Sequence, residues 1–201
     1  MINLYVEKVD GLWCGVALEG NRIFATTFVS SESETFTSLL RQLPYGMTFQ
    51  AAQEKNALAE DVLKTIKAIF DGMDISFSFE FAMDHLSYYA KRVLRFTSLV
   101  PTGYVTTYGA LARAVGGSPR AVGRVMATNR FAPLIPCHRV VAADMTLGGY
   151  GGGLKAKWEI LQRENRKYGK LVEAQINGEV LKLFPVDMLR PTRRNEKITH
   201  R

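Results

Sequence analysis

The stretch Thr107–Ala127, TYGALARAVGGSPRAVGRVMA, carries the start and stop signals of two short helices. These signals are two N-capping residues, a helix-ending glycine pair and a proline at a first helical position: Thr107, Ser118, Gly116-Gly117 and Pro119. The spacing predicts a helix-turn-helix, with helices over 108–115 and 119–128. Proteins use this unit to bind DNA and also as a simple packing device, so the spacing alone leaves both interpretations open.

The second helix of this unit is basic and unusually small on one part of its surface. Its candidate DNA contacts, taken with the two capping residues, are Thr107, Ser118, Arg120, Ala121, Gly123 and Arg124. A helix that reads the major groove more often carries long polar side chains. Small residues instead let a helix backbone approach a narrow groove, with arginine available for phosphates or for insertion into the base stack. Tight packing against a neighbouring helix is the alternative explanation of the same small residues.

The charge is distributed unevenly along the chain. Residues 1–82 hold 6 Lys and Arg against 11 Asp and Glu, whereas residues 83–201 hold 20 against 8. A basic half joined to an acidic half is typical of a protein that binds a polyanion with one face. An uneven but simply solvated surface is the alternative.

Composition limits the class of protein. With 201 residues, 47% of them hydrophobic, the chain can form one large or two small globular domains. Neither a long apolar run nor a secretory signal can be identified, so we expect a soluble monomer in the cytoplasm, associated with the nucleoid. The two cysteines and three histidines lack metal-ligand spacing, and we expect reduced thiols and no structural zinc.

The pattern of apolar residues predicts an α+β protein with two domains. Strands over 2–7, 12–18 and 22–29 with helices over 33–43 and 56–71 make a small N-terminal α+β domain, 1–82. Helices dominate from residue 84, adding 85–96 and 154–166 to the helix-turn-helix, and we expect a mostly helical domain over 83–170. Residues 171–201 form a C-terminal extension without an assigned role, and its last twelve residues are basic.

The chemistry is expected at Pro136–Val140, PCHRV. Cys137 followed by His138 is consistent with a nucleophile beside its base, a pair of metal ligands or part of a core. The apolar, proline-bounded segment before it predicts a largely buried thiol, and most buried cysteines are inert. A neighbouring base argues for reactivity. In an extended strand adjacent residues point to opposite faces, so contact between the two side chains requires a bend or a bridging water.

Together these motifs resemble the O6-alkylguanine-DNA alkyltransferases, also called methylated-DNA-protein-cysteine methyltransferases. The resemblance extends over roughly residues 84–166. It rests on these segments: PCHRV, Arg120-Ala121-Val122-Gly123, Asn129, Val100–Gly109 and Gly149-Tyr150. It implies a ribonuclease-H-like fold for the N-terminal domain and a winged-helix-like helix-turn-helix for the second.

The resemblance also implies a reaction and a set of roles. An alkyl group would pass from O6 of guanine, and from O4 of thymine as an open second substrate, to Cys137. His138 would take the thiol proton through a water, Glu164 would orient His138, and Tyr108 would donate to N3 of the leaving base. Asn129 would tie the recognition helix to the cysteine loop, and Arg120 would fill the space of the base flipped out of double-stranded DNA. The implied pocket for that base consists of Tyr108, Val140, Tyr150, Gly151 and Gly152.

A thioether has no easy route to hydrolysis, so the reaction would happen once per molecule, without a cofactor and without a protein partner. Two other functions stay open. A lesion-binding protein of the alkyltransferase-like kind would bind alkylated bases without chemistry, although such proteins lack the acceptor cysteine. A cysteine hydrolase with an incidental basic surface would show multiple turnovers and no residue that enters the duplex.

Overall fold

The computed structural model describes residues 1–52, 54, 56–176 and 178–190. The chain forms two compact units, which are described separately here. The N-terminal unit consists of Met1–Asp71, Ile75–Leu86 and Arg130–Leu134. The C-terminal unit consists of Gly72–Asp74, Ser87–Asn129 and the chain from Ile135 onward. The chain therefore returns to the N-terminal unit for five residues between the second helix of the helix-turn-helix and Cys137.

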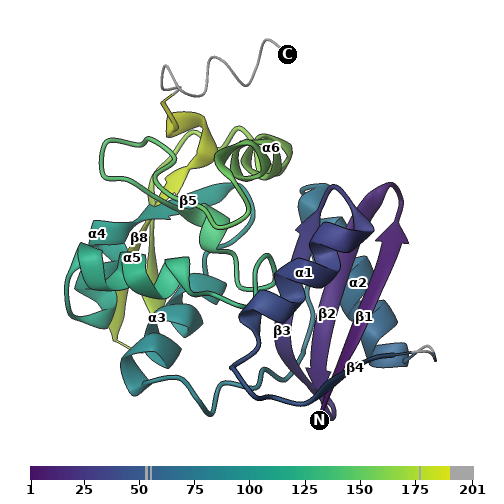
Figure 1. The fold of residues 1–201 in the computed structure, drawn as a ribbon. Helices are drawn as coiled ribbons and strands as arrows, with labels where there is room; N and C mark the ends of the chain where they lie inside the picture. The colour runs from purple at the N-terminus through teal and green to yellow at the C-terminus, as the bar shows by residue number, and fades with distance from the viewer. Residues whose placement is uncertain (53, 55, 177, 191–201) are drawn as a thin grey trace. The chain divides into compact units, whose positions relative to one another are not determined.

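The N-terminal unit contains a four-stranded mixed sheet (Figure 1). Its strands are β1 (Ile2–Val9), β2 (Leu12–Glu19), β3 (Arg22–Val29) and β4 (Phe49–Ala51), in the order β3-β2-β1-β4. The first three strands are antiparallel neighbours, as predicted, and the short β4 runs parallel to β1. Tight turns at Asp10-Gly11 and Gly20 connect them, with positive φ angles at all three residues.

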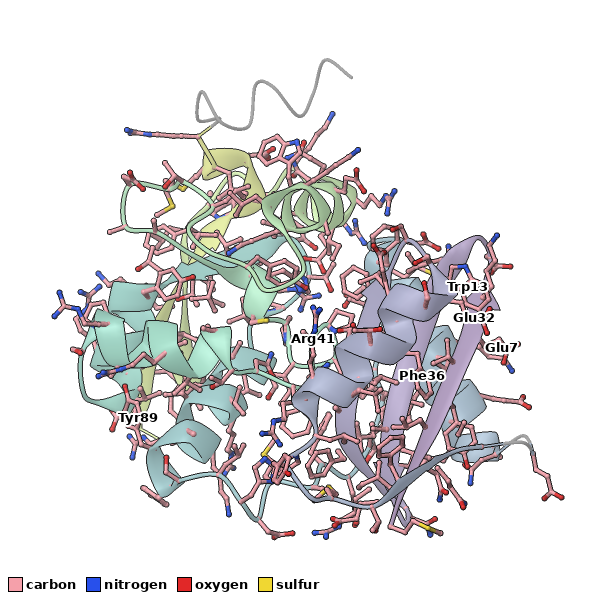
Figure 2. The ribbon with its side chains drawn as sticks, viewed as in Figure 1. Glu7, Trp13, Glu32, Phe36, Arg41 and Tyr89 are labelled. Atoms are coloured by element: carbon pink, nitrogen blue, oxygen red, sulfur yellow. The ribbon has the colours of Figure 1, made fainter. Side chains whose placement is uncertain are left out.

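Two helices cover opposite faces of this sheet: α1 (Glu32–Gln42) and α2 (Ala57–Phe70). Gly15 of β2 faces α1, where an added Cβ would lie 2.7 Å from Thr35 Cγ2, so glycine allows the helix to approach closely. Phe36, labelled in Figure 2, packs from α1 against the buried cluster that contains Leu4 and Ala17. All residues of β2 from Cys14 to Leu18 are buried, so both faces of this strand contribute to the core.

The segment Arg130–Leu134 is bound to β3. Thr26 N donates to Arg130 O at 2.7 Å, and Thr26 Oγ1 donates to Ala132 O at 2.8 Å. Phe131 is buried, with its ring 5.0 Å from that of Phe81. The apolar segment before Cys137 therefore enters the core, with Phe131 and Leu134 buried.

The C-terminal unit follows the order α3 (Tyr88–Ser98), β5 (Tyr104–Thr107), α4 (Tyr108–Val115), α5 (Pro119–Ala127), η1 (Cys137–Arg139), β6 (Val140–Val141), α6 (Leu154–Glu164), β7 (Val172–Ile176), β8 (Glu179–Pro185) and η2 (Val186–Met188). The η elements are single turns of 3₁₀-helix. All four predicted helices are present, although α3 begins three residues later than expected, because Ser87 is its N-cap.

The helix-turn-helix has the predicted caps. The Thr107 hydroxyl accepts from Ala110 N, and that of Ser118 accepts from Ala121 N. Gly117 has a φ of 97° and lies against α3, where a Cβ would come within 2.7 Å of the Tyr89 hydroxyl oxygen. Figure 2 labels Tyr89 beside these helices. Glycine is therefore required there both by backbone conformation and by space.

A second four-stranded sheet, in the order β6-β5-β8-β7, supports the helices of the C-terminal unit. Sequence patterning did not predict its strands, because β5 and β6 are only four and two residues long and the more regular β7 and β8 fall in the segment left without a role. In β8 Leu181 and Leu183 are buried, and β8 pairs with β5. The described residues of 172–188 thus belong to the folded unit, whereas the predicted basic tail at 190–201 lies, apart from Arg190, outside the described residues.

The predicted α+β class is confirmed. The N-terminal unit is a mixed sheet between two helices, and the C-terminal unit is a largely helical module around a helix-turn-helix. Within the described ranges, no helix is both long enough and apolar enough to span a membrane.

Candidate alkyl-acceptor site

Cys137 begins a single 3₁₀ turn, Cys137–Arg139, that follows a proline. The turn supplies the bend that an extended strand would lack, so consecutive side chains no longer point to opposite faces. Asn129, just beyond α5, donates from Nδ2 to Ile135 O at 2.9 Å and so holds the chain that enters this turn. The end of the second helix of the helix-turn-helix is thereby fixed to the loop that carries the thiol.

The Cys137 thiol is buried, with 6% of the residue exposed. Burial is the largest influence on the thiol and raises its pKa, because a thiolate loses its hydration there. Asn129, the positive charge of Lys157 and local backbone groups act in the opposite direction and lower that pKa. The resting group is therefore a thiol, and a base has to remove its proton before it can attack.

His138 and Glu164 form a fully buried pair, with His138 Nε2 3.0 Å from Glu164 Oε1. Glu164 stays ionised, since its contacts with His138 and Arg139 outweigh burial and lower its pKa to about 2. A carboxylate only accepts hydrogen bonds, so the His138 proton lies on Nε2. Burial lowers the pKa of His138, which keeps the ring neutral, and Nδ1 is left with a lone pair and no hydrogen-bond partner among the described residues.

Arg139 holds the same carboxylate from the other side. Its Nε donates to Glu164 Oε2 at 3.0 Å and its Nη2 to Oε1 at 2.7 Å. The remaining donors reach Val100 O at 2.6 Å and Thr102 Oγ1 at 3.0 Å. A bidentate arginine satisfies a buried carboxylate and fixes its plane. Sequence reasoning gave Arg139 no role, although its place beside His138 was visible.

A cavity of about 280 Å³ opens in front of the thiol. It is lined by residues of α4, α5, the cysteine turn and the glycine-rich loop: Tyr108, Gly123, Met126, Ala127, Cys137, Gly149, Tyr150 and Gly151. A lining of aromatic and apolar side chains with a few polar groups is suited to binding a flat heterocycle. Tyr108 OH donates to Gly149 O at 3.5 Å, so a hydrogen bond joins two lining residues, one from α4 and one from the glycine-rich loop.

The structure brings most of the predicted pocket residues together, but not all of them. Val140 and Gly152 are absent from the lining, and Val140 is fully buried. An added Cβ on Gly152 would meet the Tyr150 ring at 2.9 Å, so this glycine lets the ring lie close to the loop. Gly123, Met126, Ala127 and Gly149 line the cavity without having been predicted there. The spacing of Gly123, Met126 and Ala127 on one helical face was the available signal.

The predicted DNA-contacting residues form two groups, four residues on α5 and two helix N-caps. Arg120 and Arg124 are exposed on α5, while Ala121 and Gly123 are half-buried. Thr107 is buried and its hydroxyl is engaged by Ala110 N, so it contributes as a cap. Ser118 is exposed and caps α5 through Ala121 N. The same helix thus presents arginine to solvent and small residues to the cavity.

Lys157 is a site residue that the sequence analysis missed. It is fully buried on α6, and its Nζ donates to Val140 O at 2.6 Å and to Gly149 O at 3.2 Å. Burial lowers its pKa to about 8. Lys157 precedes Glu164 by two helical turns, so both side chains lie on the same face of α6, and this spacing was the signal. Among the described residues no group of three or more His, Cys, Asp or Glu side chains could hold a metal ion.

Comparison with known proteins agrees with this geometry. Residues 88–166 match the model of the 6-O-methylguanine DNA methyltransferase, DNA binding domain. A methylated-DNA-protein-cysteine methyltransferase of Methanothermobacter thermautotrophicus is 37% identical over 105 residues, 51% of this chain and 59% of that protein. That of Methanocaldococcus jannaschii is 30% identical over 159 residues, 79% of this chain and 92% of that protein. The first match thus spans less than two thirds of its relative, and the second spans nearly all of it.

Two further relatives bear on fold and function. The crystal structure of the O6-methylguanine-DNA methyltransferase from Pyrococcus kodakaraensis has a TM-score of 0.63 and 28% identity, covering 82% of this chain and 99% of that one. A protein of Thermus thermophilus named a DNA base-flipping protein is 38% identical over 120 residues, 58% of this chain and 81% of that protein. Fold, buried acceptor site and near-complete alignment lead to one conclusion: the chain belongs to the family of O6-methylguanine-DNA, or methylated-DNA-protein-cysteine, methyltransferases.

Proposed function

We propose that this chain repairs DNA by direct reversal, transferring the alkyl group of O6-alkylguanine irreversibly to Cys137. One observation carries the proposal: Cys137 lines a cavity large enough for a base, next to a buried histidine–carboxylate pair. His138 lies in the same 3₁₀ turn as Cys137, and its partner Glu164 lies on α6. O4-alkylthymine, which presents an alkyl group on a similar ring oxygen, is a candidate second substrate. A DNA substrate would place the protein in the cytoplasm at the nucleoid.

The alkylated base has to leave the DNA stack before the reaction, because a buried thiol cannot reach a carbon inside a duplex. Unstacking costs a few kcal/mol. We assign Arg120, exposed on the first turn of α5, to the space that the base vacates. Gly123 and Ala127 on the same helix line the cavity, which allows the helix backbone to lie near both the groove and the extruded base.

Alkyl transfer combines removal of the thiol proton with attack of the sulfur on the alkyl carbon. The thiol proton passes to His138 Nδ1, through a water molecule, and the Cys137 sulfur attacks the alkyl carbon. The sulfur–carbon bond forms while the carbon–O6 bond breaks, and its electron pair stays on the guanine ring system. Tyr108 donates its hydroxyl proton to the ring at N3, and the proton from the thiol replaces it. Thiol and alkylguanine become thioether and guanine, without net charge and without a cofactor.

The Thermus thermophilus base-flipping relative supports one alternative, namely that this chain binds alkylated bases without chemistry. In this chain Cys137 lines the cavity, and the next residue, His138, is paired with Glu164 and can act as its general base, which favours alkyl transfer. The two functions share base flipping and differ at a single atom, the Cys137 sulfur.

Mass spectrometry separates the two functions. We expect the wild-type chain, incubated with duplex DNA that contains O6-methylguanine, to gain one methyl group, located on the Cys137 peptide, at one equivalent per protein. Cys137→Ala should gain none and still bind the DNA, while Cys14→Ala should react like the wild type. Labelling that survives Cys137→Ala, more than one turnover, or a wild type that binds the lesion unchanged would contradict transfer to Cys137.

A further inference from the structure

The hairpin of β7 and β8 lies beyond residues 88–166, the part of the chain that matches the family. It is nevertheless built into the C-terminal unit, because β8 pairs with β5 and packs against α4 (Figure 1). Leu181 and Leu183 of β8 are buried, and Thr106 Oγ1 donates to Lys182 O at 2.9 Å. The reaction described so far gives this hairpin no role.

The hairpin reaches the helix-turn-helix through one ion pair. Glu179, the first residue of β8, accepts from Arg92 Nη2 of α3 at 3.2 Å. The same nitrogen donates to Ala114 O, in the last turn of α4, at 3.4 Å. A carbonyl at this position has no partner within its own helix, so an arginine satisfies it and also interacts favourably with the helix dipole. Arg92 therefore joins α3, the end of α4 and the start of β8.

The two ends of α5 are held by different contacts. The C-terminal end is fixed by Asn129, which donates to Ile135 O at 2.9 Å. The N-terminal end follows the turn Gly116-Gly117, and this turn begins at the end of α4 that Arg92 holds. Loss of the Arg92 contact should therefore displace the N-terminal end of α5 more than its C-terminal end.

These two ends have different tasks in the proposed function. Arg120, which we assigned to the DNA stack, lies on the first turn of α5. The residues of α5 that line the cavity come later in the helix: Gly123, Met126 and Ala127. A displacement of the first turn should therefore weaken the binding of duplex DNA and leave the acceptor cavity nearly unchanged.

We infer that Arg92 and Glu179 are positioning residues for DNA binding, which tie the C-terminal hairpin to the end of α4 and so set the position of Arg120. The pair does not line the cavity and acts through the end of α4. This inference rests on the DNA binding of the proposed function, but not on alkyl transfer.

Net charge and positioning predict opposite results for Glu179→Gln. DNA is a polyanion, so removing a carboxylate should strengthen binding if only net charge matters. If Glu179 positions Arg92, the same change should weaken binding. Glu173→Gln is the matched control, because Glu173 pairs with Lys182 inside the hairpin at 3.7 Å and its side chain is 50% exposed, against 46% for Glu179.

The first readout is the Kd for a duplex that contains O6-methylguanine, measured by fluorescence anisotropy at one salt concentration, with Cys137→Ala as the common background. We expect Glu179→Gln to weaken binding about threefold, the size typical of a partly exposed ion pair. Arg92→Gln should weaken it about fivefold, since it also loses the hydrogen bond to the α4 carbonyl. Arg95→Gln, at an exposed arginine of α3, measures the loss of one positive charge alone.

The double variant Arg92→Gln with Glu179→Gln tests whether the two residues act together. Its Kd should equal that of Arg92→Gln, because both changes remove the same contact. Losses that add in the double variant would overturn the inference. So would binding by Glu179→Gln that is as tight as, or tighter than, the binding by Glu173→Gln.

The second readout is the rate at which iodoacetamide labels Cys137 in the otherwise unsubstituted chain, which reports on the acceptor site and needs no DNA. We expect Arg92→Gln and Glu179→Gln to keep the wild-type rate. A general loosening of the unit would change labelling together with DNA binding, and that result would also overturn a specific role in positioning α5.

Thermal unfolding shows whether each variant is folded. Should Arg92→Gln not fold, Glu179→Gln and Glu173→Gln decide together: weaker binding in the first alone supports the inference, and equal binding overturns it. Repair of the same duplex by the wild type is measured alongside. A wild-type chain that binds the duplex and leaves it unrepaired would contradict alkyl transfer, while the comparison of Kd values would still decide the role of Arg92 and Glu179.

Discussion

The molecule contains the same chemical group in two buried settings, Cys14 on β2 and Cys137 in the 3₁₀ turn. Each thiol has a lysine acting on it. Lys67, which acts on Cys14, is paired with Asp71, and burial raises the pKa of Cys14 to about 12. Lys157, which acts on Cys137, is held by uncharged carbonyls. A thiol is thus made inert or reactive by whether the nearby charge is compensated and whether a base and a cavity adjoin it.

Glu164→Gln should reduce the reactivity of Cys137 most strongly, because it removes the charge that keeps the His138 proton on Nε2. We expect alkyl transfer to slow by about a hundredfold or more. An amide can present its NH₂ group to Nε2 and so favour the wrong tautomer, and it leaves Arg139 buried without a counter-ion. Single-turnover repair of an O6-methylguanine duplex measures the effect, with unfolding in urea as a check that the variant is native. A rate within threefold of the wild type would remove Glu164 from the mechanism.

The same substitution predicts how stability depends on pH. The pKa of Glu164 falls from 4.5 to about 2 on folding, so its stabilising contribution is fully present above pH 4.5 and is lost as the pH falls toward 2. That contribution is on the order of 3 kcal/mol. The stability difference between wild type and Glu164→Gln should therefore shrink over this range. Urea unfolding at several pH values measures it, and a constant difference would show that Glu164 titrates normally.

Arg120→Ala should slow alkyl transfer to Cys137 only when the substrate base lies in a DNA duplex. We expect repair of duplex DNA to fall about tenfold, because the vacated space in the stack stays unfilled and flipping costs more. Reaction with free O6-benzylguanine should change by less than about twofold, since that base needs no extrusion and Arg120 does not line the cavity. Arg124→Ala, at the other exposed arginine of α5, is the control for general loss of charge. Equal losses with both substrates would contradict a flipping role.

The contrast between the two cysteines also shows what the sequence could predict. Local signals were sufficient to predict the helix-turn-helix, because Thr107, Ser118 and the glycine pair start and end the helices through contacts with residues close in the sequence. The pattern of apolar residues correctly indicated the α+β class, and the resemblance correctly indicated the family. Strands β7 and β8 form a local hairpin but fall in the segment left without a role, whereas β5 and β6 were missed because they are short and their pairing partners lie far apart in the sequence. Lys157 and Arg139 were missed for the same reason: their meaning depends on carbonyls and a carboxylate that only folding brings to them.

Cys14 gives the smallest expected effect and the most direct view of the comparison. Its sulfur has one weak contact, 3.8 Å from Leu12 O, and Cys14 is not among the residues that line the cavity at Cys137. With a pKa of about 12, the folded chain should leave Cys14 unlabelled by iodoacetamide at pH 8, while Cys137 reacts. In guanidinium both should react at similar rates, because unfolding removes the environments that separate them. Cys14→Ala should lower the free energy of unfolding by only about 1 kcal/mol and leave repair unchanged. Labelling of native Cys14 as fast as Cys137 would mean that burial and charge, as described for these two sites, do not control thiol reactivity in this protein.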